Sequence, residues 1–405
     1  MTGTSPRGSA ARGQGNRAIS GAPNAAPAAG DLAWKLPAQD TTMATERSMI
    51  DDVQLAQHII EFDPSNPETY APWTELSPAT LATTHPALQP IPWPEAEAPR
   101  PRPLSATPQP ASSLPQADYL VVTWTVAEAQ ALADVLTPGH PSFTWYPYAH
   151  FFSSHYEPDI RPGAPASKAK RLGTYFPLTI GARKVLCFKS ELHLSQDGVK
   201  LPVRKLWHQI LAETRARVVI TTGTAGAIGR DVKLGDVVLG RTVRFHCSRM
   251  FAHEPFNAEQ FASPLAVPLR RLETATQKLI PVNAGMLPAP HHRLRLYYDG
   301  SPPREAPTVV TTDFFAFDNS VNTYKLQGLG AAVEMGDAVL GLVCRELGSV
   351  APGWLAIRNA SDPQIDGTLP LDEQKRAAAR IYERYGYWTT VGSAIATWAV
   401  IAGNV

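Results

Sequence analysis

Two adjacent polar residues, Ser361 and Asp362, follow an apolar run at 354–357 that is typical of a β-strand. A strand that ends in Ser-Asp places a carboxyl group at the carboxyl edge of a sheet, where open α/β sheets bind their ligands. A carboxyl group in that position can exchange a proton with a bound molecule. An Asp followed by Pro363 is also typical of a helix start, so Asp362 could cap a helix instead.

A second polar cluster lies at the start of a predicted helix. A strand end at 331–333 leads into Glu334 and Asp337 and then into apolar residues at helical spacing up to 347. Gly348 stands where a C-cap glycine belongs. The rest of the chain can then be interpreted as building a pocket around this segment and the strand that ends in Ser-Asp.

The elements that must position these residues alternate along the chain. A β-rich run at 119–124 precedes a helical pattern at 126–136, for which Thr125 or Thr123 could be the cap. The pattern continues with strands at 184–188, 218–220, 237–239 and 308–310, a helix at 206–214, and a Gly-rich turn at 221–229. Strands that alternate with helices predict an α/β layer fold with a mainly parallel or mixed sheet.

The first 116 residues differ in composition from the rest. They hold 18 of the 38 prolines and are rich in Ala, Ser, Thr and Gly, which predicts a disordered tail. Within it, residues 48–60 have Ser48 as a possible N-cap and apolar residues on one side, which predicts a short amphipathic helix. This helix could pack loosely on the main domain or bind a protein partner.

Composition limits the classes of function. A net charge of +1 over 405 residues gives no global field that would attract nucleic acid or a membrane surface. The three cysteines are far apart, fit no metal-ligand spacing, and are expected to be reduced and buried. The chain begins without the apolar run of a signal peptide, so we expect a cytoplasmic protein. The histidines have no spacing with Cys or carboxylates that suggests metal ligands, so we expect no metal, and we expect no cofactor.

Four segments together resemble the nucleoside phosphorylase superfamily, and most closely its hydrolytic branch, the methylthioadenosine/S-adenosylhomocysteine nucleosidases. The segments are 222–228 (Thr-Gly-Thr-Ala-Gly-Ala-Ile), 233–238 (Lys-Leu-Gly-Asp-Val-Val), 333–335 (Val-Glu-Met) and 357–362 (Ile-Arg-Asn-Ala-Ser-Asp). The resemblance covers about residues 118–403. It implies a three-layer α/β/α domain with a central mixed, twisted sheet at 117–405, with an insertion at about 137–180.

The resemblance also implies roles for individual residues in cleaving an N-glycosidic bond. Asp362 would be the general acid that protonates a purine ring nitrogen. Glu128 would orient the attacking water, or else is a solvated helix residue, and Phe315 would stack on the base, or else is a core residue. The remaining implied contacts are Ser361 and Gly226 with the base, and Met335, Glu334, Asp337 and Thr224 with the sugar.

Two positions depart from the family pattern. Phosphorolytic members place an Arg before the Gly-rich segment to hold phosphate, whereas this chain has Thr221, which favours water as the nucleophile. The family follows its Met with a Glu that binds ribose hydroxyls, whereas this chain has Gly336 and then Asp337. One helical residue is a rotation of about 100°, so Asp337 replaces that Glu only if the helix start is rewound.

A basic segment at 161–205 could hold the phosphates of a nucleotide substrate, or could be a solvated face. The superfamily includes AMP nucleosidases and nucleotide-depleting effector domains of bacterial defence systems, so a nucleotide substrate has precedent. The candidate phosphate-binding residues are Lys168, Lys170, Arg171, Arg183, Lys184 and Arg244.

We therefore expect a hydrolase that releases the free base from a purine nucleoside or nucleotide. The alternatives are a non-catalytic sensor that binds such a molecule, and a phosphorolytic purine nucleoside phosphorylase. Members of this superfamily imply a homo-oligomer, and the tail could bind a protein partner.

Overall fold

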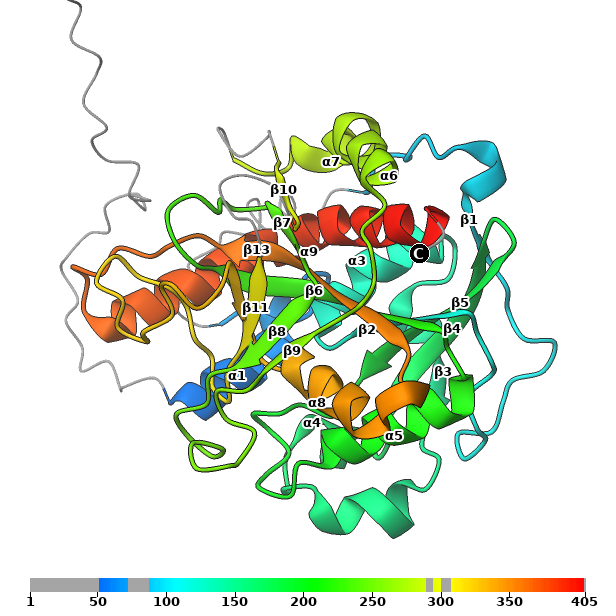
Figure 1. Cartoon of the computed structure of the whole chain (residues 1–405), viewed down its shortest axis with the longest axis horizontal. Helices are drawn as coiled ribbons and strands as arrows, with labels where there is room; N and C mark the ends of the chain where they lie inside the picture. The colour runs from blue at the N-terminus through cyan, green and yellow to red at the C-terminus, as the bar shows by residue number, and fades with distance from the viewer. Residues whose placement is uncertain (1–50, 72–86, 289–293, 300–306, 404–405) are drawn as a thin grey trace, which may run out of the picture. The chain divides into compact units, whose positions relative to one another are not determined.

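The computed structural model describes residues 51–71, 87–288, 294–299 and 307–403. Thirteen strands of these residues form one mixed sheet (Figure 1). The strands are β1 (Pro99–Pro101), β2 (Tyr119–Thr123), β3 (Tyr146–Tyr148), β4 (Gly173–Ile180), β5 (Arg183–Ser190), β6 (Val218–Ala227), β7 (Val237–Gly240), β8 (Thr242–Phe245), β9 (Gln260–Ala262), β10 (Leu296–Tyr297), β11 (Thr308–Thr311), β12 (Ala332–Glu334) and β13 (Gly353–Asp362).

The centre of the sheet is parallel and its flanks are mixed. β5, β2, β6 and β13 are parallel neighbours. β4 joins β5 antiparallel, β7 joins β13 antiparallel, and β12 joins the far end of β6 antiparallel. Beyond β12 the sheet continues through β11, β8 and β9. The carboxyl ends of β2, β6 and β13 therefore meet at one edge.

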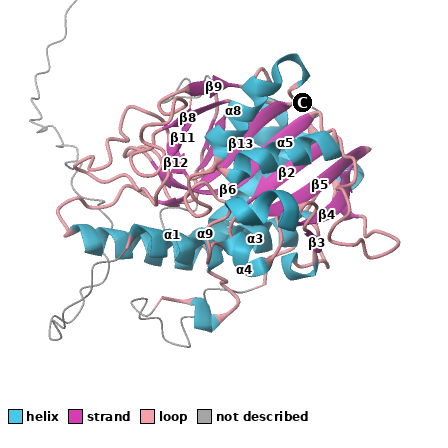
Figure 2. Ribbon diagram, turned by 90° about the horizontal axis from the view of Figure 1, so that it is seen from below, coloured by secondary structure: helices cyan, strands magenta, loops and turns pink. Residues whose placement is uncertain are grey.

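Helices cover both faces of this sheet, as Figure 2 shows. α5 and α8 pack on one face, and α3 and α9 lie together on the other. This arrangement confirms the predicted three-layer fold with a mixed sheet. The helices are α1 (Asp52–Glu61), α3 (Val126–Leu136), α4 (Pro165–Ala169), α5 (Pro202–Thr214), α6 (Leu269–Thr274), α7 (Pro281–Ala284), α8 (Asp337–Leu347) and α9 (Leu371–Ala402).

β6 is longer than the sequence predicts. The predicted Gly-rich turn at 221–229 is wrong up to Ala227, because residues 218–227 form one continuous, fully buried strand. Its first part pairs with β2 and β13, and its last residues pair with β12. These three ladders supply the backbone hydrogen bonds that a turn would otherwise lack, so glycines are tolerated inside the strand.

Part of the predicted tail belongs to this fold. Residues 1–50 and 72–86 lie outside the described residues, but the expectation of disorder does not hold for 51–71 and 87–116. α1 begins after the N-cap Asp51, not after Ser48, and buries Leu55, Ala56, Ile59 and Ile60. β1 adds an antiparallel strand to β4. Isolated apolar residues of this Pro-rich segment pack against other parts of the domain, and composition alone does not reveal these contacts.

The predicted insertion at 137–180 also contains part of the sheet. Its last eight residues are β4, which lies between β1 and β5. The segment before β4 contains β3, a third antiparallel partner, and the short α4. These strands could not be recognised in the sequence, because their aromatic and Pro residues do not give the alternation of apolar and polar residues by which a strand is identified.

Two further expectations concern side chains and helix length. Cys187, Cys247 and Cys344 are free and buried, as expected. Across the described ranges, we find no helix with the length and apolar character needed to cross a membrane.

Leu114 tests whether the segment before β2 is part of the folded core. It is 4% exposed and belongs to the main apolar cluster, so Leu114→Ala should lower the free energy of unfolding by about 2–5 kcal/mol in urea denaturation. Leu369→Ala is the matched control, because Leu369 is 39% exposed and should lose far less. Equal losses would show that residues before β2 do not share the domain core.

Candidate functional site

One cavity gathers most of the residues that the sequence singled out. It lies at the carboxyl ends of β2, β6 and β13, beside β12, with α1 and α9 completing its wall. Eight predicted site residues line it: Glu128, Thr224, Gly226, Phe315, Glu334, Met335, Ser361 and Asp362. These residues come from five separate parts of the chain, so the fold is what brings them together.

Asp362 ends β13 with one carboxylate oxygen unused. Its Oδ1 accepts a hydrogen bond of 3.0 Å from Ser361 Oγ, whereas the buried Oδ2 has no partner. A Cβ atom on Gly226 would lie 3.0 Å from Oδ2, so the glycine keeps that side of the carboxyl group open. Burial raises the pKa of Asp362 to about 7, although the Ser361 bond opposes the shift. The helix-cap alternative is wrong, since the next helix begins at Leu371.

The buried carboxylate of Glu128 links the carboxyl-terminal parts of β2 and β6. Its Oε2 completes a capping box with Thr125 and also accepts bonds from Thr123 Oγ1 (2.8 Å) and Trp124 N (3.0 Å). Its Oε1 accepts bonds of 2.7 Å from both the backbone N and Oγ1 of Thr224. The solvated alternative for Glu128 is therefore wrong. Both oxygens are occupied by the protein, so the carboxylate fixes the geometry of this edge.

Gly223 is what allows that link. Its φ of +145° is a conformation that L side chains rarely adopt, and a Cβ there would lie 2.3 Å from Glu128 Oε1. The Gly-Thr sequence of β6 thus has a packing reason: the glycine admits the carboxylate and the threonine binds it.

Arg358 is the electrostatic centre of the site. It is 2% exposed, and its guanidinium binds the carboxylate of Asp337 through two hydrogen bonds, one of them 2.8 Å from Nε to Oδ2. Its Nη2 lies 3.5 Å from Glu334 Oε2 and its Nη1 3.9 Å from Glu128 Oε1. Burial alone would lower the pKa of Arg358, but Asp337 and the other carboxyl groups raise it on balance. The guanidinium is therefore a permanent positive charge within a group of carboxyl groups.

Glu334 faces the cavity beside this charge. Its Oε1 accepts hydrogen bonds from Thr311 Oγ1 and, at 2.9 Å, from Asp337 N. Burial and then repulsion from Asp337 raise the pKa of Glu334 against the opposing effect of Arg358. Glu334 can therefore hold or release a proton closer to neutral pH than an ordinary Glu.

Gly336 lies against the ring of Trp124. A Cβ at this position would lie 3.3 Å from Trp124 Cζ2 and 3.7 Å from Glu334 Oε2. The Trp124 ring also covers Arg358, whose guanidinium carbon is 4.8 Å from the ring centroid. A side chain at position 336 would therefore meet the Trp124 ring first, and the nearest carboxylate to this position is that of Glu334.

Comparison with known proteins places this site in a family. Residues 153–384, more than half of the chain, match the family model of the phosphorylase superfamily. The chain belongs to the phosphorylase superfamily. The resemblance predicted from four short motifs is thereby confirmed. A search of curated protein sequences finds no significant match.

Solved structures that resemble this phosphorylase-superfamily chain include two 5′-methylthioadenosine/S-adenosylhomocysteine nucleosidases. That of Neisseria meningitidis is 16% identical, with 70% of this chain and 99% of that chain covered and a TM-score of 0.42. That of Helicobacter pylori is 12% identical, with 71% and 98% covered and a TM-score of 0.43. The futalosine hydrolase of Helicobacter pylori is 14% identical, with 70% and 97% covered and a TM-score of 0.42.

The superfamily domain does not bring every predicted site residue into the cavity. Asp337 lies behind it, held by Arg358. None of the six candidate phosphate-binding residues lines it. Lys168 pairs with Glu61 at 2.8 Å, Lys170 with Glu157 at 2.6 Å, and Arg171 with Glu191 at 2.8 Å. Arg183 and Lys184 begin β5 and Arg244 lies on β8, all away from the cavity lining.

Several cavity residues of the superfamily domain were not predicted. Arg358 was visible as a charge inside an apolar strand, a signal that a buried partner is required. His193 had no such signal: it lines the cavity, and its buried Nε2 has no partner. Burial, with help from Lys189, lowers the pKa of His193 to about 3, so the ring is neutral. Within the described residues, no group of three or more His, Cys, Asp or Glu could hold a metal ion.

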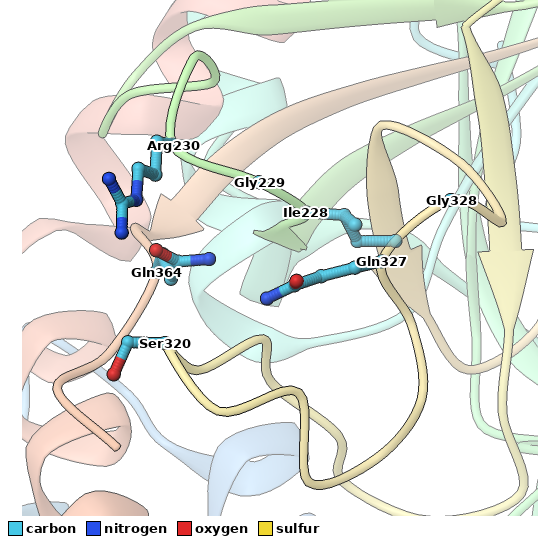
Figure 3. Close-up of a pocket in the computed structure, with 7 residues that line it drawn as sticks. All are labelled: Ile228, Gly229, Arg230, Ser320, Gln327, Gly328 and Gln364. Atoms are coloured by element: carbon cyan, nitrogen blue, oxygen red, sulfur yellow. The ribbon is translucent and has the colours of Figure 1, made fainter. Parts of the chain in front are cut away.

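A second hollow lies beyond the strand ends, where the chain continues past Gly226 and Asp362. It measures about 250 Å³ and is mostly polar. Figure 3 shows the side chains of Gln327 and Gln364 extending into it, and both amides donate hydrogen bonds to Asp318. None of the predicted site residues lines this hollow, so the smaller cavity around Asp362 is the candidate site.

The Arg358–Asp337 pair should be a major stabilising contact of the domain. Arg358→Met leaves Asp337 buried without a cation, so the free energy of unfolding should fall by about 3–5 kcal/mol in urea denaturation at pH 7. Arg204→Gln removes a guanidinium that is 47% exposed and paired with Glu346, and should cost at most ~1 kcal/mol. A loss from Arg358→Met no larger than that of the control would contradict the central role of this pair.

Proposed function

We propose that this protein hydrolyses the N-glycosidic bond of a purine nucleoside and releases the free base. Membership of the phosphorylase superfamily supports a reaction at the bond between base and sugar. The observation that carries the proposal is the unpartnered Oδ2 of Asp362, buried at the end of β13 and open towards the cavity.

Asp362 would act as the general acid. As the bond breaks, its electron pair moves to the base, and a proton from Asp362 Oδ2 would neutralise the departing ring nitrogen. A pKa near 7 leaves much of Asp362 protonated at neutral pH, which an ordinary Asp would not be. Phe315 lines the cavity and would stack on the base, although its burial serves the core as well.

The charges around the cavity favour water over phosphate as the nucleophile. Arg358 is the one cation among the cavity-lining residues, and it is already bound by Asp337. Asp337 balances the charge of Arg358, and the Glu128 carboxylate lies on the same side, so the sugar carbon would meet negative potential as it becomes positively charged. The same potential would repel a phosphate ion. Thr221 is fully buried within β6 and does not line the cavity.

The same reasoning favours a nucleoside over a nucleotide. Lys168, Lys170 and Arg171 are engaged with carboxylates outside the cavity, and among the residues that the structure describes no free cation lines the cavity to bind a 5′-phosphate. Glu334 would take the sugar hydroxyls in place of a Glu at Gly336, because it is the carboxylate nearest to that position. A homo-oligomer and a protein partner for the N-terminal segment stay predictions.

The proposal is tested by substituting the acid. Asp362→Asn should slow base release by about 10²–10⁴-fold with folding preserved, because the amide cannot supply the proton. Free base and free sugar are measured chromatographically from adenosine, inosine and methylthioadenosine, with and without phosphate. Asp366→Asn is the control, since Asp366 is half-buried outside the cavity lining and its carboxylate accepts hydrogen bonds from nearby Thr368. A well-folded Asp362→Asn variant with full activity, or a sugar phosphate as product, would refute the proposal.

The pH dependence of wild-type activity provides a second check. Asp362 must be protonated to donate, and its raised pKa of about 7 means that the acid form is lost above that value. We therefore expect kcat/KM to fall as pH rises through about 7, approaching tenfold per pH unit. The residual activity of Asp362→Asn should lack this fall. An identical decline in that variant would assign the titration to another group.

A further inference from the structure

The N-terminal helix α1 forms one wall of the candidate cavity. Ile59 and Ile60, near its C-terminal end, both line the cavity and are almost completely buried. Phe62, just after the helix, lies 6.0 Å from the ring of Tyr382, a further lining residue contributed by α9. The segment therefore closes a site that is otherwise built from residues after 118.

With α1 in place, the cavity is too small for the proposed substrate. Its volume is about 60 Å³, which is room for a few water molecules. Pockets that bind small molecules usually measure about 300–1,000 Å³. Some part of the wall must therefore move before a nucleoside can enter.

α1 is the part of the wall that can move with the least disruption. The strand ends around the cavity are held by backbone ladders on both sides. α1 pairs with no strand. Its buried apolar face and its pairs with α9, Asp52–Lys375 and His58–Glu383, both at 2.6 Å, anchor it to the domain. Two more exposed ion pairs add to this anchoring. Asp52 binds Arg249 at 3.0 Å, and Glu61 binds Lys168 at 2.8 Å. These two cations are 56% and 49% exposed, so each pair is worth little in water.

We propose that α1 is a built-in cap that closes the cavity and must withdraw Ile59 and Ile60 before a nucleoside binds. The identity of the molecule that enters rests on the proposed function, but the closure itself does not. On this view Lys168, which the sequence suggested for phosphate binding, controls access to the site from outside it.

A chemical label measures opening without any need for catalysis. Ala225→Cys places a thiol in the cavity wall, and Ala316→Cys is the second choice if the first does not fold. Modification by iodoacetamide is followed at each cysteine by mass spectrometry. The buried Cys187, Cys247 and Cys344 report global unfolding in the same sample. We expect the cavity cysteine to react at least tenfold faster than these three.

The two exposed ion pairs of α1 are then removed by substituting the cations, which lie outside the helix. Lys168→Gln with Arg249→Gln should raise the labelling rate of the cavity cysteine about two- to tenfold, because each exposed pair contributes ~0.2–1 kcal/mol. The matched control is Lys170→Gln with Lys200→Gln, since these cations pair with Glu157 and Asp159 and not with α1. Equal labelling in both double variants, or labelling no faster than at the native cysteines, would overturn the cap.

Activity separates this inference from the proposed function. With the native Ala225, the Lys168→Gln/Arg249→Gln variant should show a kcat/KM for base release raised by a similar factor. If base is released but the cavity cysteine is labelled at the same rate in both double variants, the cap is overturned and the proposed hydrolysis stands. Labelling that responds, with no base released from any nucleoside, would support the cap and overturn the proposed hydrolysis.

Discussion

The buried guanidinium of Arg358 is the constraint on which the rest of the site depends. A charge removed from water must be compensated on the spot, and here Asp337 does so through two hydrogen bonds. Glu334 and Glu128 complete the surroundings from β12 and α3. The Trp124 ring covers the remaining face. One positive charge thus fixes the relative positions of four side chains, which come from the stretches 124–128 and 334–337, at the carboxyl edge of the sheet.

The carboxyl groups around the cavity are of two kinds. Asp337 and Glu128 are used up in binding protein groups, through Arg358 in one case and through backbone and hydroxyl donors in the other. Asp362 and Glu334 have oxygens with fewer partners and raised pKa values. Carboxyl groups with different environments can perform different tasks within one small volume. Asp337 and Glu128 hold the edge rigid, and Asp362 and Glu334 are the two to which the proposed function gives a role.

Much of the fold could be predicted because local patterns coincide with it. α3 and α8 have helical spacing and recognisable caps at Thr125 and Gly348, and both form as expected. Asp362 could be placed at a strand end for the same reason. For α1 the sequence predicted an amphipathic helix that either packs on the domain or binds a partner, and the structure shows it packed on the domain. Its place in the cavity wall could not be predicted, because that place depends on Tyr382 and on the other lining residues. The partner of Arg358 was equally hidden, since Asp337 is 21 residues away and was assigned to the sugar.

Gly223 and Glu128 show how the packing of such a site limits which substitutions it can accept. A side chain at 223 would occupy the space of the Glu128 carboxylate, and the unusual φ adds backbone strain. Glu128 in turn is held by donors from both β2 and β6. A larger residue can therefore arise at 223 only after position 128 has been shortened. The two substitutions therefore have an obligatory order. The intermediate between them lacks the carboxylate that joins the two strand ends.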